Sequence, residues 1–254
     1  MKRRVFIQSL LGLLLTPITA IAAAWNKSAF EAQKLEEAQR NLAVNAELKN
    51  LDIEIVAPDR AENGAVVQIE VNCRIPNAEA IAIFVAENPT PLIANYMLGA
   101  GTQSHVVTRI KMAQTSEVKA VVKVGERYFF NSKQVVVLED GCGGSDSDGK
   151  FESSMKMRAK LVGEQVEVKV IIVHPMTTGR SKNSAGDIIP AHFIQVLQAR
   201  LNGKPVLEAH YGTAIAKNPY LTFYLNGATV GDKVDVSWVD NQGNRGQGEI
   251  LVSL

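Results

Sequence analysis

Cys142 is the residue of this sequence whose surroundings best suit covalent chemistry. It lies between Gly141 and the pair Gly143-Gly144, within a stretch (139–150) of small and polar residues whose only apolar member is the cysteine. Glycine on both sides widens the accessible backbone conformations, so this stretch is typical of a flexible linker that exposes the thiol. An exposed thiol is prone to oxidation, and its presence in such a stretch indicates that the thiol is used.

The neighbours of Cys142 do not activate it as a nucleophile. No Lys or Arg lies within five residues on either side, whereas reactive cysteines depend on nearby cations. Acidic side chains disfavour the thiolate, and four of them flank it: Glu139, Asp140, Asp146 and Asp148. We therefore expect a site of covalent attachment on which other proteins act, and no catalytic residue in this chain.

The second cysteine, Cys73, is expected to be buried. It is in phase with Val67, Ile69 and Val71, which alternate with polar residues, and it should therefore point into a core. A disulfide between Cys73 and Cys142, or a role for Cys73 as a resolving thiol, are the alternatives. Neither cysteine belongs to a C-x-x-C pair, which argues against a thioredoxin-type redox centre.

Composition excludes several classes of protein. The 254 residues include 27 basic and 26 acidic side chains, for a net charge of +1. This balance argues against an electrostatic nucleic-acid binder. An apolar fraction of 46% is typical of a globular protein.

Residues 1–24 are predicted to form a twin-arginine-type signal peptide. Arg3-Arg4 precede an apolar stretch that ends at Ala22-Ala23-Ala24, where a signal peptidase could cut before Trp25. We expect a periplasmic mature protein that is not inserted in the membrane after cleavage. An uncleaved anchor is the alternative, but the apolar stretch is short for a membrane span.

The mature chain is predicted to be all-β after a short N-terminal helix. Ser28–Leu42 should form one helix, capped by Ser28 with Glu31 three residues later. Short alternating segments separated by Gly, Asn and Pro are then typical of β-sandwiches. These segments are 53–55, 67–75, 80–85, 106–112, 118–124, 127–130, 134–138, 158–161, 166–173, 193–201, 206–210, 221–225, 233–239 and 249–252. Two domains, 25–138 and 151–254, are thus expected on either side of the linker 139–150.

Two further sets of residues are candidate sites. His174, His192 and His210 form no compact ligand pair in the sequence, so we expect strand-end or surface histidines and no metal site. Arg180 and Lys182 lie in a predicted loop, where a solvated turn is expected; the alternative is that they hold an anionic adduct near the linker.

Several segments resemble two protein families in order along the chain. Those similar to the SoxY family are 58–67, 87–89, 108–112 and the glycine-rich segment 141–144. Those similar to the SoxZ family are 174–179, 189–194, 217–221 and 236–240. The resemblance covers nearly all of the mature chain and indicates a fusion of a SoxY-like domain with a SoxZ-like domain.

This resemblance implies two immunoglobulin-like sandwiches and a periplasmic carrier of thiosulfate-derived sulfur. Cys142 would be the attachment residue, and Gly141, Gly143 and Gly144 would give flexibility to the arm (139–150). It implies that the carrier has no redox cofactor of its own. It also implies a c-type cytochrome and a sulfate-releasing hydrolase as partners, with a sulfane dehydrogenase as a further partner. A thiol-disulfide oxidoreductase and a plain two-sandwich binding module are the competing hypotheses. In the family the arm ends the SoxY chain, whereas here the chain continues, so the reach of the arm should be smaller.

Overall fold

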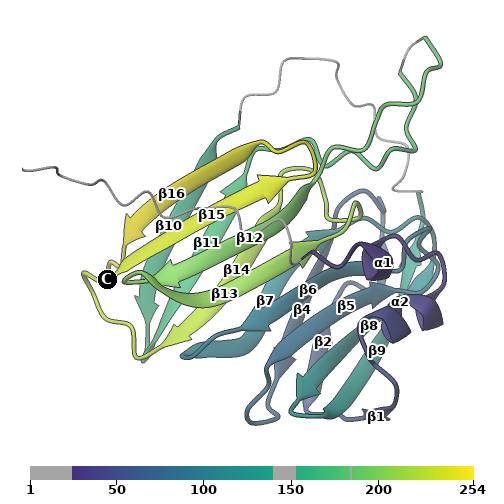
Figure 1. Cartoon of the computed structure of the whole chain (residues 1–254). Helices are drawn as coiled ribbons and strands as arrows, with labels where there is room; N and C mark the ends of the chain where they lie inside the picture. The colour runs from purple at the N-terminus through teal and green to yellow at the C-terminus, as the bar shows by residue number, and fades with distance from the viewer. Residues whose placement is uncertain (1–24, 140–152, 184) are drawn as a thin grey trace, which may run out of the picture.

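The computed structural model describes residues 25–139, 153–183 and 185–254, and its regular secondary structure is almost entirely β-strand (Figure 1). The helices are α1 (Lys27–Phe30) and α2 (Leu35–Asn41). The strands of the first half are β1 (Glu47–Lys49), β2 (Ile53–Val56), β3 (Arg60–Ala61), β4 (Val67–Cys73), β5 (Ala80–Val85), β6 (Leu92–Leu98), β7 (Thr102–Ile110), β8 (Ser116–Val124) and β9 (Arg127–Val137). Those of the second half are β10 (Met155–Val162), β11 (Gln165–Ile172), β12 (Ile194–Leu201), β13 (Lys204–Tyr211), β14 (Tyr220–Asn226), β15 (Lys233–Asp240) and β16 (Arg245–Leu251).

The N-terminal segment forms two short helices, so the prediction of one helix over Ser28–Leu42 is wrong. The first helix is capped by Asn26, whose side chain accepts a hydrogen bond from the backbone N–H of Ala29 at 3.1 Å. Ser28 does not cap it; its hydroxyl donates to Asn26 Oδ1. The two helices cover a patch of the outer face of one sheet, where Phe30 packs in a cluster with Phe84.

The short strands β1 and β3 were not predicted, and β6 and β9 differ from the prediction for opposite reasons. The prediction missed β6, because its first three residues are all buried and show no alternation of polar and apolar side chains. The predicted break between the segments 127–130 and 134–138 is absent, and β9 continues through it as one strand of 11 residues. Asn131 is held there because its side chain donates to the backbone carbonyl of Ile53 at 2.7 Å.

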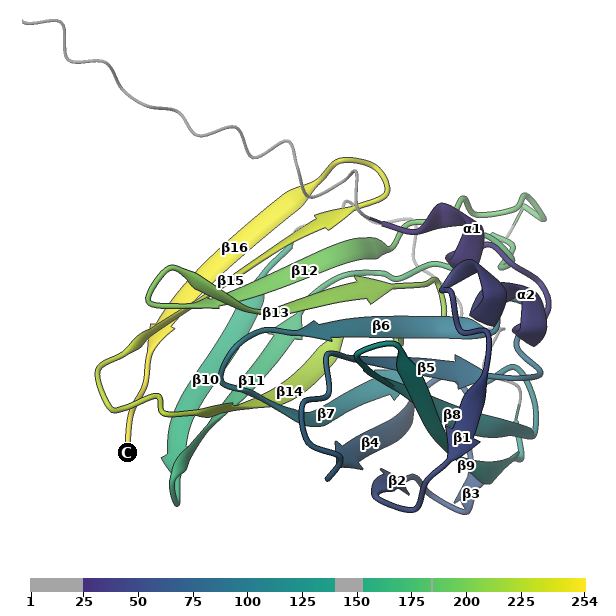
Figure 2. The same cartoon turned by 60° about the horizontal axis from the view of Figure 1, so that its bottom comes forward.

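The strands form two sheets, and each sheet runs from one half of the chain into the other. The larger has the order β1-β9-β8-β5-β6-β13-β12-β15-β16, with β3 beside β9, and the smaller β10-β11-β14-β7-β4-β2. Each half is thus a sandwich of two sheets, and the second half has four strands facing three, as in immunoglobulin-like folds. Figure 2 shows β16, β15, β12, β13 and β6 following one another across the larger sheet.

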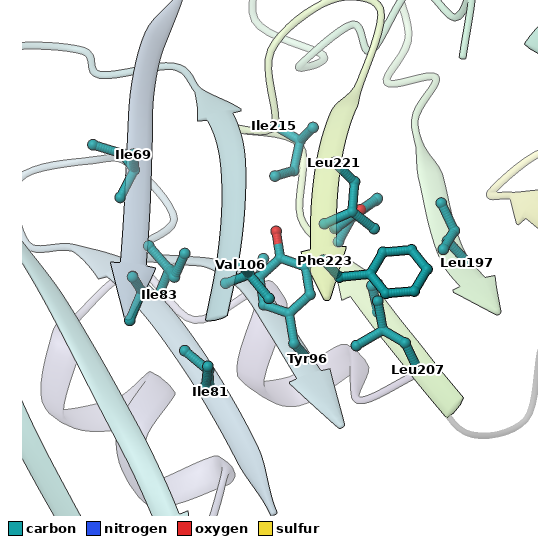
Figure 3. Close-up of a cluster of buried hydrophobic side chains, with 14 of the residues drawn as sticks. Ile69, Ile81, Ile83, Tyr96, Val106, Leu197, Leu207, Ile215, Leu221 and Phe223 are labelled. Carbon is teal, nitrogen blue, oxygen red and sulfur yellow. The ribbon is translucent and has the colours of Figure 1, made fainter. Parts of the chain in front are cut away.

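The halves meet at a seam, which we define as the pairing of β6 with β13 and of β7 with β14. Leu98 is opposite Leu207 in the first pair and Thr108 is opposite Leu221 in the second. The main cluster of buried side chains runs through both halves, and Figure 3 shows Tyr96 lying among seam side chains such as Phe223. The ring of Tyr96 meets that of Tyr211 edge-on, with centroids 6.1 Å apart. Side chains and sheets therefore both cross from one half to the other.

Cys73 lies in the core of the first half, which confirms its prediction as a packing residue. It is 8% exposed and it is a free thiol. Within the described residues, no helix has the length and apolar character needed to cross a membrane.

Candidate functional site at the ends of the arm

The arm residues predicted to carry the function, Cys142 with Gly141, Gly143 and Gly144, lie outside the described residues. So does the predicted signal peptide, 1–24. The structure does describe the two points from which the arm leaves the sandwich, at Glu139 and at Ser153-Ser154, and these points define the candidate site.

The first root of the arm is fixed to the start of the first half. The backbone carbonyl of Glu139 accepts a hydrogen bond from Gly64 N–H at 2.9 Å, and the N–H of Leu138 donates to Ala61 at 3.0 Å. The carbonyl of Gly64 in turn accepts from Met112 N–H at 2.8 Å. The root is thus held by the segments before β4 and after β7.

The second root is fixed to the second half. The carbonyl of Ser154 accepts from the N–H of Val173 at 2.8 Å, and Met155 then pairs with Ile172 as β10 begins. The next residue after Val173 is His174, so the second root lies one residue away from a buried histidine.

Lys111 links the chain segments that hold the two roots. It directly precedes Met112, which holds the first root, and its ammonium donates to the carbonyl of Met176 in the second half. Its backbone N–H donates to Ala214 at 2.7 Å, also in the second half. Asn88 fixes this segment from the other side, because its side chain donates to the carbonyl of Lys111 at 2.8 Å. Both roots therefore lie at the same end of the two-half sandwich, which we call the arm-root end.

A compact cluster of His174, His192 and Asp240 lies at the arm-root end. The buried Asp240 Oδ2 accepts from His192 Nε2 at 2.7 Å and from His174 Nε2 at 3.3 Å. Asn244 donates to the same oxygen at 2.9 Å. The two imidazole rings meet edge-on, with centroids 4.6 Å apart.

In this cluster, electrostatic interactions keep Asp240 as the carboxylate anion and the buried His174 as the neutral imidazole. Burial raises the pKa of the Asp240 carboxyl, but hydrogen bonds from His174, Asn244 and His192 outweigh it and hold that pKa well below its ordinary value. Burial lowers the pKa of His174, against the opposing effect of Asp240. The side chains of His174 and Asp240 are fully buried, and that of His192 is 14% exposed.

The sequence prediction for the histidines is corrected in part. His174 and His192 come together with an aspartate that the sequence did not suggest, so they are not isolated strand-end side chains. His210 is elsewhere, on β13, where its Nε2 lies 2.7 Å from Glu208 Oε1. All three members of the cluster lie in segments that resemble SoxZ, and this was the signal that could have found Asp240.

The hydrogen bonding of the cluster does not suit a metal ion, although its ligand atoms lie within 4.8 Å of one another. A histidine that binds metal through one ring nitrogen normally donates a hydrogen bond from the other. Here the other nitrogen of His174, Nδ1, faces a donor, the backbone N–H of Met176 at 3.2 Å. The proton of neutral His174 is therefore on Nε2 and points to Asp240.

Two further segments, 108–112 and 217–221, which resemble SoxY and SoxZ, meet at the arm-root end. Arg109 stacks over the ring of Tyr220 at 4.6 Å, and the carbonyl of Arg109 accepts from Ala216 N–H. Asn218 accepts from His174 N–H at 3.1 Å and donates its own N–H to the carbonyl of His174. These segments therefore assemble the arm-root end from both halves.

Arg180 and Lys182, which were predicted to lie in a solvated turn, are in the loop between β11 and β12. This loop projects beyond the strand ends in green in Figure 1. Arg180 and Lys182 are both exposed. Lys182 forms an isolated bridge with Ile188 within the loop. This agrees with a solvated turn, and their use in holding an anionic adduct stays a prediction.

An open hollow of about 750 Å³ lies beside the first root. It is lined by Ala86, Glu87, Ala113, Gln114, Thr115, Ser116, Glu117, Gln134 and Val137. The charged residues in this lining are Glu87 and Glu117, so the hollow repels an anionic group.

Cys73 lies far from the first root of the arm, which argues against a disulfide to Cys142 within one chain. Cys73 ends β4, whereas the first root is held by Gly64, before β4 begins at Val67. The length of β4 separates the two ends by about 20 Å, at about 3.3 Å per residue. Three residues from Glu139 to Cys142 span at most about 11 Å, and disulfide Cα atoms lie within about 7 Å.

Comparison with known proteins gives two family models in tandem. The model described as sulfur oxidation protein SoxY matches residues 39–142, and the model described as sulphur oxidation protein SoxZ matches residues 155–250. A solved structure of the sulfur carrier protein SoxY from Chlorobium limicola f thiosulfatophilum is 32% identical and covers 45% of this chain and 100% of its own, with a TM-score of 0.39. A comparison with curated proteins gave no match.

Proposed function

Because this chain belongs to the SoxY and SoxZ families of sulfur oxidation, joined here in one polypeptide, we propose that it carries sulfur intermediates covalently on Cys142. The SoxY match ends on Cys142 and the SoxZ match begins at residue 155. The cysteine thus belongs to the segment that connects the two roots at the arm-root end, and this placement is the observation that carries the proposal.

The proposed chemistry follows from what the family resemblance implies for a thiol. The Cys142 thiol and thiosulfate lose one proton and two electrons to form R–S–S–SO₃⁻, and a c-type cytochrome takes the electrons. Water then cleaves the terminal S–S bond in a partner hydrolase, releasing hydrogen sulfate and leaving R–S–SH on the arm. A sulfane dehydrogenase is a further partner for the remaining sulfur. The chain itself catalyses none of these steps and needs no cofactor.

Attachment at both ends restricts where these partners bind. Cys142 stays within about 11 Å of the Glu139 Cα, because three extended residues span no more. A partner that reaches the thiol must therefore dock at the arm-root end, on residues of both halves. We place these partners and this chain in the periplasm, after export through the signal at 1–24.

The direct test is to load the thiol and measure the intact mass. Tetrathionate converts a thiol to R–S–S–SO₃⁻ with release of thiosulfate and a proton, so it loads the arm without partner enzymes. We expect one adduct on the wild type and on Cys73→Ala, none on Cys142→Ser, and no turnover of Cys142→Ser with the cytochrome and hydrolase. Turnover by Cys142→Ser would refute the carrier proposal. An internal disulfide on oxidation would instead support the oxidoreductase hypothesis.

A further inference from the structure

The loop between β11 and β12 is closed at its base by the two residues that border it. Thr177 and His192 exchange backbone hydrogen bonds, at 2.8 Å from Thr177 N–H and 3.2 Å from His192 N–H. The hydroxyl of Thr177 also donates to the carbonyl of Pro190 at 2.8 Å. Below this closure lies Asp240, which accepts from the side chains of both His192 and His174.

The hydrogen bonds around the His174 ring fit only its neutral form. Its Nδ1 accepts from Met176 N–H and its Nε2 donates to Asp240, so both ring nitrogens are used by a neutral imidazole. A second proton would go to Nδ1 and would point at the N–H of Met176, where two donors cannot form a hydrogen bond. The turn 174–177 must therefore open for His174 to become charged.

The groups that face His174 come from several elements. Asp240 at the end of β15 favours the charged form, whereas Lys111 after β7 and His192 before β12 disfavour it. The ring of Trp238, on β15, lies edge-on at 5.6 Å and excludes water from this side. Burial, His192 and Lys111 together lower the pKa of His174 more than Asp240 raises it, so the closed state keeps His174 neutral.

We propose that His174, His192 and Asp240 form an acid-released latch that closes the base of the 177–191 loop. As the pH falls below about 6.5, the ordinary pKa of histidine, the open state binds a proton that the closed state does not accept. Opening is thus favoured on the acid side and closure on the alkaline side. The latch lies beside the second root of the arm, because Val173, which holds Ser154, directly precedes His174. The proposal does not depend on what Cys142 carries.

Hydrogen exchange on the full chain, corrected for the intrinsic effect of pH, tests the latch. Between pH 8 and pH 5 we expect protection of peptides from 173–193 to fall relative to those from 194–211. The fall should be about tenfold for each unit by which closure lowers the pKa of His174, up to about thirtyfold, because pH 5 lies about 1.5 units below the ordinary histidine pKa of about 6.5. His174→Gln, which keeps a donor and an acceptor but does not titrate, should remove this dependence. His105→Gln is the matched control, because His105 pairs with Glu70 in the first half at 2.8 Å, and it should keep the wild-type dependence.

Two readouts that do not need His174→Gln keep the proposal testable if that variant fails to fold. Imidazole ¹⁵N shifts at pH 8 should give His174 as the Nε2–H tautomer, and the opposite tautomer would overturn the assignment. Titration with Zn²⁺ at pH 8 should give no site that depends on Asp240. One equivalent of Zn²⁺ bound by the wild type and lost in Asp240→Asn would make the cluster a metal site and not a latch. Protection of 173–193 that is independent of pH would also overturn the proposal.

Discussion

Cutting the arm should leave the two halves of this protein associated, and the seam determines how strongly. A protease site placed within residues 143–150 would convert the intramolecular contact into a bimolecular one. The halves would still share two sheets, through β6 with β13 and β7 with β14. We therefore expect the cut protein to elute as one species in gel filtration at about 1 µM, which requires a binding free energy of about −8 kcal/mol or better.

Tyr96→Ala is the perturbation that should weaken this association most clearly. Tyr96 is fully buried on β6 and meets Tyr211 of the second half edge-on. Removing a buried aromatic side chain costs about 3–5 kcal/mol. If the whole loss falls on the seam, the Kd of the cut halves rises by about 100-fold to 4,000-fold, at about 1.4 kcal/mol for each factor of ten. Since Tyr96 also packs within the first half, this is an upper bound.

Ile53→Ala is the matched control for this experiment. Ile53 is equally buried but lies on β2, at the edge of the smaller sheet and two strands away from β7. It should lower the melting temperature of the uncut chain, since such a truncation costs about 2–5 kcal/mol, and leave the Kd of the cut halves unchanged. The reasoning is refuted if the cut wild type separates at about 1 µM, or if the two variants change the Kd equally.

Two further predictions concern the core and the export of the chain. The hydroxyls of Tyr96 and Tyr211 are buried close to each other, and that of Tyr96 also lies close to Thr108. Within the described part of the chain none of these contacts has the full geometry of a hydrogen bond, and an unsatisfied buried group costs about 1–3 kcal/mol. The double variant Tyr96→Phe/Tyr211→Phe should therefore raise the melting temperature, and a lower one would show that the hydroxyls are paired. For export, Arg3→Lys/Arg4→Lys should trap the precursor in the cytoplasm; an unchanged periplasmic yield, measured by fractionation and blotting, would count against the twin-arginine route.

The strands could be predicted wherever one face is buried and the other is polar. In β4 the burial alternates along the whole strand, and the predicted inward position of Cys73 is confirmed. The prediction failed at β6, where the outer face is covered as well. Leu92 packs with Phe30 of the first helix in the cluster on that face, and a strand buried on both faces has no period of two.

The seam could not be predicted in detail, because strand pairing between distant segments leaves no local pattern. Leu98 and Leu207 are opposite each other, yet more than a hundred residues separate them. The sequence indicated two sandwiches and a linker, which is consistent with halves that merely touch. Only the structure shows that β6 and β13 continue one sheet.

The cluster at the arm-root end was missed for a related reason. His174 and Asp240 are separated by 66 positions in the sequence, and ligand or triad sets with such spacing are not recognisable without a local signature. Grouping His174 and His192 with His210 did not point to the cluster either, because His210 is paired with Glu208 on β13. The informative feature was the resemblance of the segments 174–179, 189–194 and 236–240 to one family.

The two roots of the arm are fixed to different halves, and this couples the seam to the proposed carrier function. Glu139 is held by Gly64 in the first half and Ser154 by Val173 in the second. Any tilt of one half against the other changes the distance that the arm must span. Strand pairing at the seam and the hydrogen bonds of Lys111 across it resist that tilt. A weakened seam should therefore alter the presentation of Cys142 even though no residue of the arm is changed.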